Sequence, residues 1–250
     1  MTMRIDVLTL FPEIFEGPLQ ASLLGRAQEE GLLNIAITDI RDFATDRHHT
    51  VDDAPFGGGP GMVMKCEPIF AAVEQLKDRN SLEHVVLMSP RGRPLTQDVV
   101  RELAEHPDLV LVCGRYEGVD ERVSQALCTD EISIGDYVLS GGEVPALVLI
   151  EAISRMLPGV VGDWESVETD SFYDGILGAP QYTRPAKFRD LEVPEVLRNG
   201  NHKDIRRYRR KEAIRLTRLR RPELLEKCTE EDAPLLEEIE REERVTHEER

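Results

Sequence analysis

Residues 109–122 read LVLVCGRYEGVDER, and this stretch sets the architecture that we expect for the whole chain. Its first five residues are apolar, which is typical of a strand that is buried on both faces of a sheet. Gly114 and Gly118 follow directly, so the chain turns where the strand ends. In an open α/β sheet, ligands collect at such turns, outside the carboxyl ends of the strands.

Strand-like and helix-like segments alternate around this stretch. Pro12 and Thr96 are plausible first residues of helices, and a proline-glycine pair at 158–159 ends another. Alternation of this kind predicts a layered α/β domain with a mostly parallel sheet. We expect strands at residues 4–10, 32–37, 84–88, 109–113 and 131–140, and helices at residues 12–30, 96–105 and 144–157, with a short helix closing at 125–129.

The pattern changes after Gly159. Residues 162–178 are polar and acidic without a sustained period, which indicates a linker or an ordered loop. We therefore expect a first domain at residues 1–160, a linker at 161–175 and a helical domain at 176–250.

The helical domain carries recognisable caps. Asn201 or Asp204 is expected to cap a helix that runs through Arg221, and Thr229 with Asp232 approximates a capping box for a last helix. The expected buried positions are Ile205, Tyr208, Leu216 and Leu219 in the first of these helices, and Leu235, Leu236 and Ile239 in the second.

Charge is distributed unevenly along the chain. The total of −17 by itself argues against a nucleic-acid partner, because phosphate binding requires positive charge. Residues 198–221, however, carry eleven Lys and Arg against two Asp and Glu, a net charge of +9. The sums on either side are −18 for residues 1–197 and −8 for residues 222–250. A solvated helix face and an RNA contact both remain open explanations of the basic block.

Several classes of protein are not expected. The longest uncharged apolar run, residues 144–150, is far shorter than the ~20 residues that span a bilayer. Acidic residues near the N-terminus do not fit a signal peptide. The four cysteines lack the spacing of a zinc or redox motif, so we expect free thiols in a reducing cytoplasm. His48 and His49 are adjacent and point in different directions, so they do not predict a metal site.

Glycine-rich turns are the candidate ligand-binding elements. The loop at residues 57–61 lacks the ending of a P-loop, so a tight turn and a close backbone approach are both open for it. Turns at residues 89–92 and 114–118 follow predicted strands, and residues 134–142 form a third glycine-containing stretch of this kind. If they meet at one sheet edge, their backbone groups form an uncharged pocket that suits a nucleoside-like ligand.

The order of the motifs resembles the bacterial tRNA (guanine-N1)-methyltransferase family, the TrmD family of the SPOUT class, from end to end. The segments that carry this resemblance are Leu10-Phe11-Pro12-Glu13, Arg41-Asp42-Phe43, Thr50-Val51-Asp52-Asp53, Gly61-Met62, residues 112–122, residues 133–139 with Gly141-Gly142-Glu143, Asp170-Ser171-Phe172, Tyr182-Thr183-Arg184-Pro185 and residues 219–225.

The resemblance implies a trefoil-knotted α/β methyltransferase domain with a parallel sheet, followed by a small helical domain that binds tRNA. It also implies a homodimer whose active site is shared between subunits, and S-adenosylmethionine as the methyl donor. By position, the residues that would line the cofactor are Leu87, Met88, Ser89, Pro90, Gly92, Gly114, Tyr116, Glu117, Ile134, Gly135, Tyr137, Leu139, Gly141 and Gly142.

The same resemblance implies the reaction. The substrate would be the guanosine 3′ to the anticodon of tRNA (position 37), with Asp170 as catalytic base and Arg155 as its partner at the guanine. Mg²⁺ is implied without identified ligands. Spacing alone would place both side chains on a solvated surface. The basic block would grip tRNA phosphates, with Arg206, Arg207, Arg210 and Lys211 as the RNA-binding residues.

Two other functions are weighed against this one. A related SPOUT enzyme would methylate another RNA or a ribose 2′-OH, but the segment at residues 170–172 and the C-terminal basic block argue against it. An RNA-binding module with an inert pocket is the second alternative, and the presence of Asp170 and Arg155 argues against that.

Overall fold

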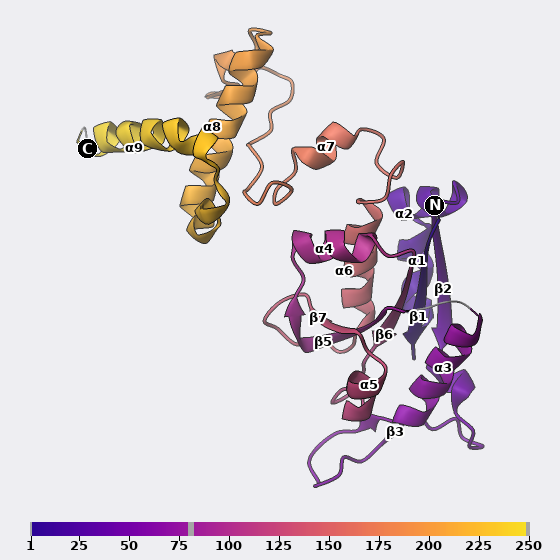
Figure 1. Ribbon diagram of the computed structural model, residues 1–250. Coiled ribbons are helices and arrows are strands. Elements are labelled where there is room, and N and C mark those ends of the chain that lie inside the picture. Colours follow the sequence, from indigo (N-terminus) through magenta and orange to yellow (C-terminus); the bar gives the residue numbers. More distant parts are fainter. Residues whose placement is uncertain (1, 80–82, 249–250) are drawn as a thin grey trace. The chain divides into compact units, whose positions relative to one another are not determined.

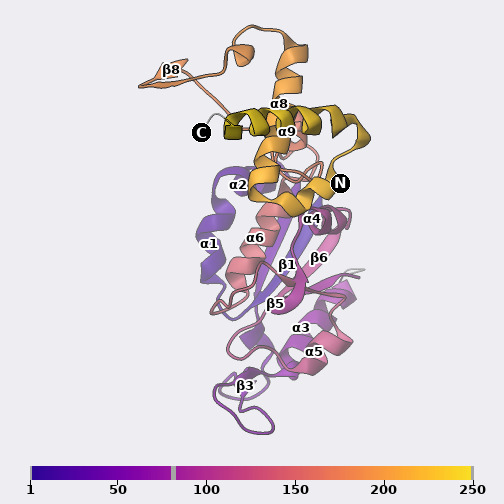
Figure 2. The same cartoon turned by 90° about the vertical axis from the view of Figure 1, so that its left-hand side faces the viewer.

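The computed structural model describes residues 2–79 and 83–248 (Figures 1 and 2). The chain divides into two compact units, Met1–Gly162 and Asp163–Arg250. The first unit is built on a sheet and the second consists mainly of helices. No helix in the described part of the chain combines the length and the apolar character needed to cross a bilayer.

The first unit contains a five-stranded sheet in which all neighbouring strands run parallel. The central position belongs to the run at 109–113, whose five side chains are fully buried. The prediction of a strand buried on both faces is therefore confirmed. In sheet order, the strands are β2 (Leu33–Asp39), β1 (Met3–Thr9), β6 (Asp108–Cys113), β5 (Val85–Pro94) and β7 (Asp130–Ser133).

Two hydrophobic clusters cover the two faces of this sheet. Leu109, Leu111 and Cys113 of β6 belong to one cluster, and Val110 and Val112 belong to the other, as the alternation of side chains along a strand requires. The first cluster includes residues from α1 (Glu13–Gln20), α2 (Ser22–Glu29), α4 (Gln97–Ala104) and α6 (Glu143–Ser154), and the second from η1 (Ile40–Phe43), α3 (Cys66–Arg79) and α5 (Glu121–Ala126).

The prediction of a single helix at residues 12–30 is wrong, because the chain forms two helices there, α1 and α2. The break falls at Ala21, which is extended, and Ser22, which has φ 52°. Pro18 lies inside α1 and lacks the N–H that a continuous helix would need. After the break, Gly25 lies against the Gln20 carbonyl, and a Cβ at Gly25 would come within 2.3 Å of that oxygen.

The prediction of a strand at residues 131–140 is also wrong beyond Ser133, where β7 ends. Gly135 has φ 150°, a conformation that a strand does not use, and Tyr137 N–H donates to the Gly135 carbonyl. The released segment becomes one wall of the pocket described below. The short helix also lies earlier than expected, because Asp120 caps α5 by accepting from the Arg122 N–H. Thr96 caps α4 as predicted.

A short antiparallel pair, β3 (Asp52–Asp53) with β4 (Val63–Met64), flanks the glycine loop at residues 57–61. Met64 N–H donates to the Gly118 carbonyl, and Glu117 N–H donates to the Met62 carbonyl. The chain that follows the glycine loop is thereby held against the turn after β6.

The second unit has a small core made by two helices and a loop. The predicted Asn201 cap and the capping box of Thr229 with Asp232 are both present, because such caps depend on residues only a few positions apart. The core residues are Ile176, Ala213, Ile214, Leu235 and Ile239. The elements are α7 (Trp164–Glu168), β8 (Lys187–Phe188), β9 (Leu191–Glu192), η2 (Glu195–Leu197), α8 (His202–Arg220), η3 (Pro222–Lys227), η4 (Glu230–Asp232) and α9 (Ala233–Glu248).

Three details of this unit differ from the sequence-based prediction. The side chains of Ile205, Tyr208, Leu216 and Leu236, expected to be buried, are only partly buried. Leu219 is 78% exposed, because the buried side of α8 is the side that includes Ile214 and Thr217. The stretch expected to lack regular structure contains α7, which Asp163 caps by accepting from the Glu165 N–H.

Candidate functional site

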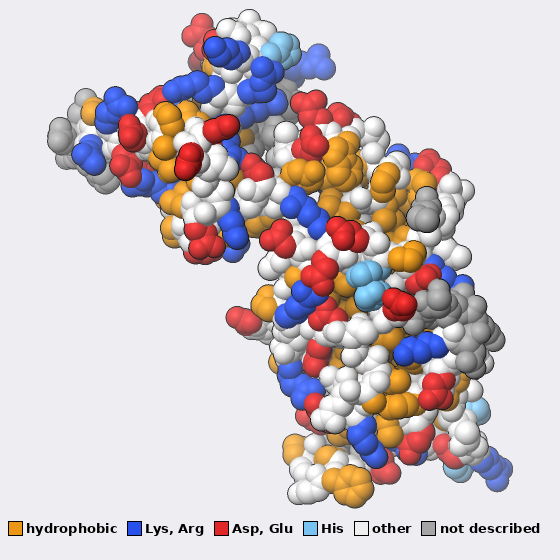
Figure 3. Space-filling model, in the orientation of Figure 1, with side chains coloured by type: hydrophobic (Ala, Val, Ile, Leu, Met, Phe, Trp, Pro, Cys, Tyr) orange, Lys and Arg blue, Asp and Glu red, His pale blue; other side chains and the backbone are white. Residues whose placement is uncertain are grey.

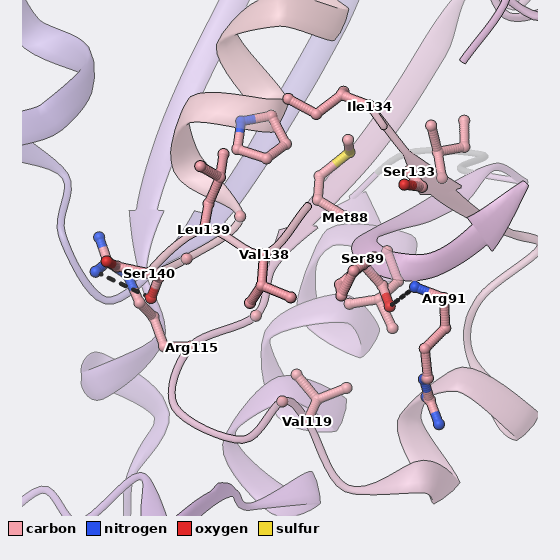
Figure 4. A pocket seen from close by; sticks show the side chains of 18 of the residues that line it. Met88, Ser89, Arg91, Arg115, Val119, Ser133, Ile134, Val138, Leu139 and Ser140 are labelled. Carbon is pink, nitrogen blue, oxygen red and sulfur yellow. Dashed lines mark hydrogen bonds between the residues drawn. The ribbon is translucent and has the colours of Figure 1, made fainter. Parts of the chain in front are cut away.

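A pocket of about 300 Å³ lies at the carboxyl ends of β5, β6 and β7 (Figure 4). These three strands are neighbours in the sheet, so their carboxyl ends lie at one edge. The prediction of a turn at residues 89–92 is wrong, because these residues belong to β5, whose pairing with β7 shifts register between Met88 and Arg93. Figure 4 shows Met88 and Ser89 between Val119 on one side and Ile134 on the other. The three walls are residues 87–91, 114–119 and 132–142, to which Pro145 adds a contact.

The residues predicted to line the cofactor site meet around this pocket, with the exception of Gly92. Gly92 instead lies against β7, where a Cβ would fall 2.4 Å from the backbone of Glu131 and Ile132. It allows the end of β5 to approach β7. The predicted residues that line the pocket are Leu87, Met88, Ser89, Pro90, Gly114, Tyr116, Glu117, Ile134, Gly135, Tyr137, Leu139, Gly141 and Gly142.

Two walls of the pocket touch backbone to backbone at Gly142. Its N–H donates to the Gly114 carbonyl at 2.8 Å, and a Cβ on Gly142 would lie 2.8 Å from the Cys113 Cα. Neither neighbour is a flexible side chain, so the contact requires a residue without a Cβ. Gly142 also stands at the N-cap of α6, so this contact joins the helix to the end of β6.

A buried ion pair that the sequence did not reveal supports the same walls. The Glu143 side chain is 1% exposed, and its Oε2 lies 2.9 Å from Arg115 Nε. Thr9 Oγ1 donates to Glu143 Oε1 at 2.8 Å, and the Arg115 guanidinium lies 4.2 Å from the centre of the Phe11 ring. The Arg115 Nη1 also donates to the Ser140 carbonyl at 3.4 Å (Figure 4). Arg115 and Glu143 both belong to the family segments, but nothing in the sequence showed that they pair.

The two predicted catalytic residues belong to different units. Arg155 follows α6 in the first unit, where its N–H donates to the Glu151 carbonyl at 3.4 Å. Asp170 follows α7 in the second unit, where its N–H donates to the Val167 carbonyl at 3.2 Å. Asp170 is exposed and Arg155 is partly buried.

Comparison with known proteins gives one consistent result. A family model described as tRNA (guanine-1)-methyltransferase TrmD matches residues 3–227. The chain belongs to this family. Among curated relatives named tRNA (guanine-N(1)-)-methyltransferase, the protein of Moorella thermoacetica is 55% identical over 245 residues, which cover 96% of this chain and 98% of that protein. The relative from Desulforamulus reducens is 53% identical over 241 residues, 95% of each chain.

The basic block of this TrmD-family chain is largely paired within its own unit. Arg207 pairs with Glu238, Lys211 with Glu238 and Glu242, and Arg210 with Asp232 and Asp174. Figure 3 shows Lys and Arg gathered over the first turns of α8, whereas positive and negative side chains mix along α9. Of the four residues predicted to bind RNA, three are therefore held in ion pairs, and Arg206 is exposed.

The Mg²⁺ implied by the family resemblance has no donor set within the described residues. No group of three or more His, Cys, Asp or Glu side chains there is placed to hold a metal ion. Residues 2–79 and 83–248 therefore offer no cluster of three protein donors for Mg²⁺, and we derive no step through this ion.

Replacing Glu143 by glutamine is expected to lower the free energy of unfolding of the first unit by about 2 kcal/mol. Glutamine keeps the shape and can accept from Thr9, but it leaves the Arg115 guanidinium without a counter-charge. Urea unfolding measures the effect, with Glu13→Gln as the control, because Glu13 is an exposed first-turn carboxylate on α1. An equal midpoint for the two variants would show that the buried pair contributes no net stability.

Proposed function

We propose that this chain transfers a methyl group from S-adenosylmethionine to N1 of the guanosine 3′ to the anticodon of tRNA, position 37. The observation that carries the proposal is the pocket at the ends of β5, β6 and β7, in which the residues predicted for the cofactor converge in a chain of the TrmD family. Family membership supports the reaction class, and the convergence of these residues supports the pocket as the cofactor site.

The lining of the pocket suits the chemistry of S-adenosylmethionine. Its apolar side chains, among them Leu87, Ile134 and Leu139, suit an adenine ring, and its glycine turns expose backbone donors and acceptors. The pocket is not uncharged, contrary to expectation, since Arg91, Arg115 and Glu117 line it. Arg91 pairs with Glu121 and Arg115 with Glu143, so Glu117 is the carboxylate that suits a positively charged ligand. When bound, S-adenosylmethionine supplies an electrophilic methyl group on a sulfonium centre.

The catalytic roles rest on the chemistry of guanine. N1 carries a proton, so its lone pair is unavailable until a base removes that proton. We assign the base to Asp170, with a contribution of about 10²–10⁴-fold, typical of general-base catalysis. Negative charge then develops on O6, where the Arg155 guanidinium is a suitable charge-assisted donor.

The proposal includes a division of labour along the chain. Residues 1–160 form the catalytic domain with a trefoil knot, residues 161–175 act as the linker that carries Asp170, and residues 176–250 bind tRNA in the cytoplasm. Support for the knot comes from the tight approach of the 134–142 segment to the turn after β6, where Gly142 and Gly114 are hydrogen-bonded.

We also propose a homodimer whose active site is completed by both subunits. An exposed apolar surface next to the pocket supports it. Val138 is 82% exposed on the pocket loop, and Val144 and Val148 are exposed one turn apart on α6. Burial of these apolar side chains against a second subunit would remove them from water. Sedimentation in solution tests the dimer directly.

Methyl transfer to defined tRNAs tests the function. With a methyl-labelled donor, we expect label in a tRNA that has guanosine 3′ to the anticodon and none when adenosine replaces it. Mass analysis of the nucleosides is expected to give N1-methylguanosine. A 2′-O-methylated product would favour the related SPOUT enzyme, and no transfer to the guanosine tRNA would overturn the proposal.

A further inference from the structure

The second unit contains a pocket of its own, which none of the roles above uses. It has a volume of about 300 Å³ and lies between the segment at 180–186 and the first turns of α8. The side chains that matter for its chemistry are Tyr182, Arg184, Leu197, Arg198, Ile205 and Arg209.

The pocket brings together three arginines that have no acidic partner within the described part of the second unit, Arg184, Arg198 and Arg209. On the opposite side of α8, carboxylates of α9 neutralise Arg207, Lys211, Arg215 and Arg218, so these side chains are already satisfied. Within residues 2–79 and 83–248, by contrast, no hydrogen bond or ion pair engages the guanidinium groups of the three pocket arginines. Their charge is available for an outside ligand.

Helix geometry explains the separation. Ile205 and Arg209 are four residues apart and share one side of α8. Lys211, Arg215 and Arg218 follow one another at intervals of four and three residues, and all three pair with α9. The acidic α9 therefore neutralises one side of a basic helix and leaves the other side positive.

The remaining lining of the pocket is apolar and aromatic. Val193, Leu197 and Ile205 are partly buried, and the Tyr182 ring is 48% exposed. Tyr208 of α8 interacts with Tyr182, and burial raises the pKa of Tyr208 to about 12, with smaller contributions from Glu212 and Tyr182. No Asp or Glu is among the described lining residues. The guanidinium groups suit a phosphate, and the apolar floor with the exposed Tyr182 ring suits a planar base. Together they match a nucleotide.

We propose that this pocket holds one nucleotide of the tRNA substrate. Its phosphate lies among the guanidinium groups of Arg184, Arg198 and Arg209, and its base lies against Tyr182 and the apolar floor. The proposal rests on the proposed function only in taking tRNA as the substrate. The RNA contact then lies on the side of α8 that carries Arg209. It does not involve Arg207, Arg210 and Lys211, which are held in ion pairs.

Direct tRNA binding tests the pocket separately from catalysis. In fluorescence anisotropy with labelled tRNA, the double variant Arg198→Gln/Arg209→Gln is expected to raise the Kd about tenfold. The salt slope is expected to fall by roughly 0.7–0.9, the value for one phosphate. Arg241→Gln removes one exposed charge from α9 and is expected to leave both quantities unchanged. Arg184→Gln alone provides a second test outside α8.

A second pair of variants tests the aromatic contact. Tyr182→Phe keeps the ring and is expected to bind tRNA like the unmodified chain, whereas Tyr182→Ala is expected to weaken binding several-fold, because base–aromatic stacking is lost. Equal binding by the two variants would overturn the stacking assignment.

Inorganic phosphate distinguishes a free anion from tRNA. Stabilisation by phosphate in a thermal melt, combined with an unchanged tRNA Kd in the arginine variants, would make the pocket an anion site and overturn the tRNA assignment. An unchanged Kd in variants of a chain that still methylates tRNA would overturn the pocket and leave the proposed function intact. If the unmodified chain does not methylate tRNA, but the arginine and tyrosine variants still weaken tRNA binding, only the proposed function is overturned.

Discussion

Replacing Asp170 by asparagine is expected to lower kcat for methyl transfer by about 10²–10⁴-fold, the usual contribution of a general base. Asparagine has nearly the same shape and hydrogen-bonding reach as aspartate, but it cannot accept the N1 proton of guanine. The Kd for S-adenosylmethionine is expected to stay unchanged, because Asp170 belongs to a different unit from the cofactor pocket. Single-turnover kinetics measure the first quantity and calorimetry the second.

Asp190→Asn is the matched control for this substitution. Asp190 is an exposed carboxylate in the turn between β8 and β9 of the same unit, so its replacement makes the same change of charge away from the proposed chemistry. We expect the control to turn over at the normal rate. Near-normal turnover by Asp170→Asn would remove Asp170 from the role of base.

Replacing Gly142 by alanine is expected to weaken binding of S-adenosylmethionine by at least about tenfold, which corresponds to 1.4 kcal/mol. The backbone conformation itself tolerates alanine, since Gly142 has φ −79°. The added methyl group, however, would lie 2.8 Å from the Cys113 Cα and 3.0 Å from the Gly114 nitrogen. The two pocket walls then have to separate, because neither contact is a side chain that can rotate away. Overpacking of this kind also lowers stability, typically by about 1–3 kcal/mol.

Gly162→Ala separates this steric effect from the general effect of alanine. A Cβ at Gly162 meets nothing within 4 Å, so the control is expected to bind S-adenosylmethionine normally and to melt at the normal temperature. Calorimetric titration and a thermal melt measure both variants. Identical affinities for Gly142→Ala and Gly162→Ala would show that the backbone contact between the pocket walls does not shape the cofactor site.

Local features of this fold were predictable because their causes are local. The apolar run at 109–113 identifies a buried strand, and Thr96 and Asn201 begin helices through bonds to N–H groups only two or three residues away. The turn after β6 was predictable for the same reason, and the rule for parallel sheets places the carboxyl ends of neighbouring strands at one edge. This is why almost all the residues named for the cofactor line one pocket.

Features that depend on close packing were not predictable. The helix expected at 12–30 breaks at Ala21, where Gly25 makes room for the Gln20 carbonyl. Gly92 was expected to line the pocket, but it lies against the backbone of β7 and allows β5 to approach that strand. In both places the glycine is required by a backbone atom that lies close to it in the folded chain. The pattern of side chains in the sequence does not indicate where that backbone atom lies.

By itself, the sequence determined the strand-and-turn pattern, the caps, the position of the basic block and the family motifs. Tertiary structure alone decided which charges of that block are neutralised. Glu238 stands 31 positions after Arg207 and 27 after Lys211, and the packing of α9 on α8 brings these side chains together. The burial of Glu143 against Arg115 arises in the same way. An ion pair requires atoms within a few ångströms, and only the folded chain sets those distances.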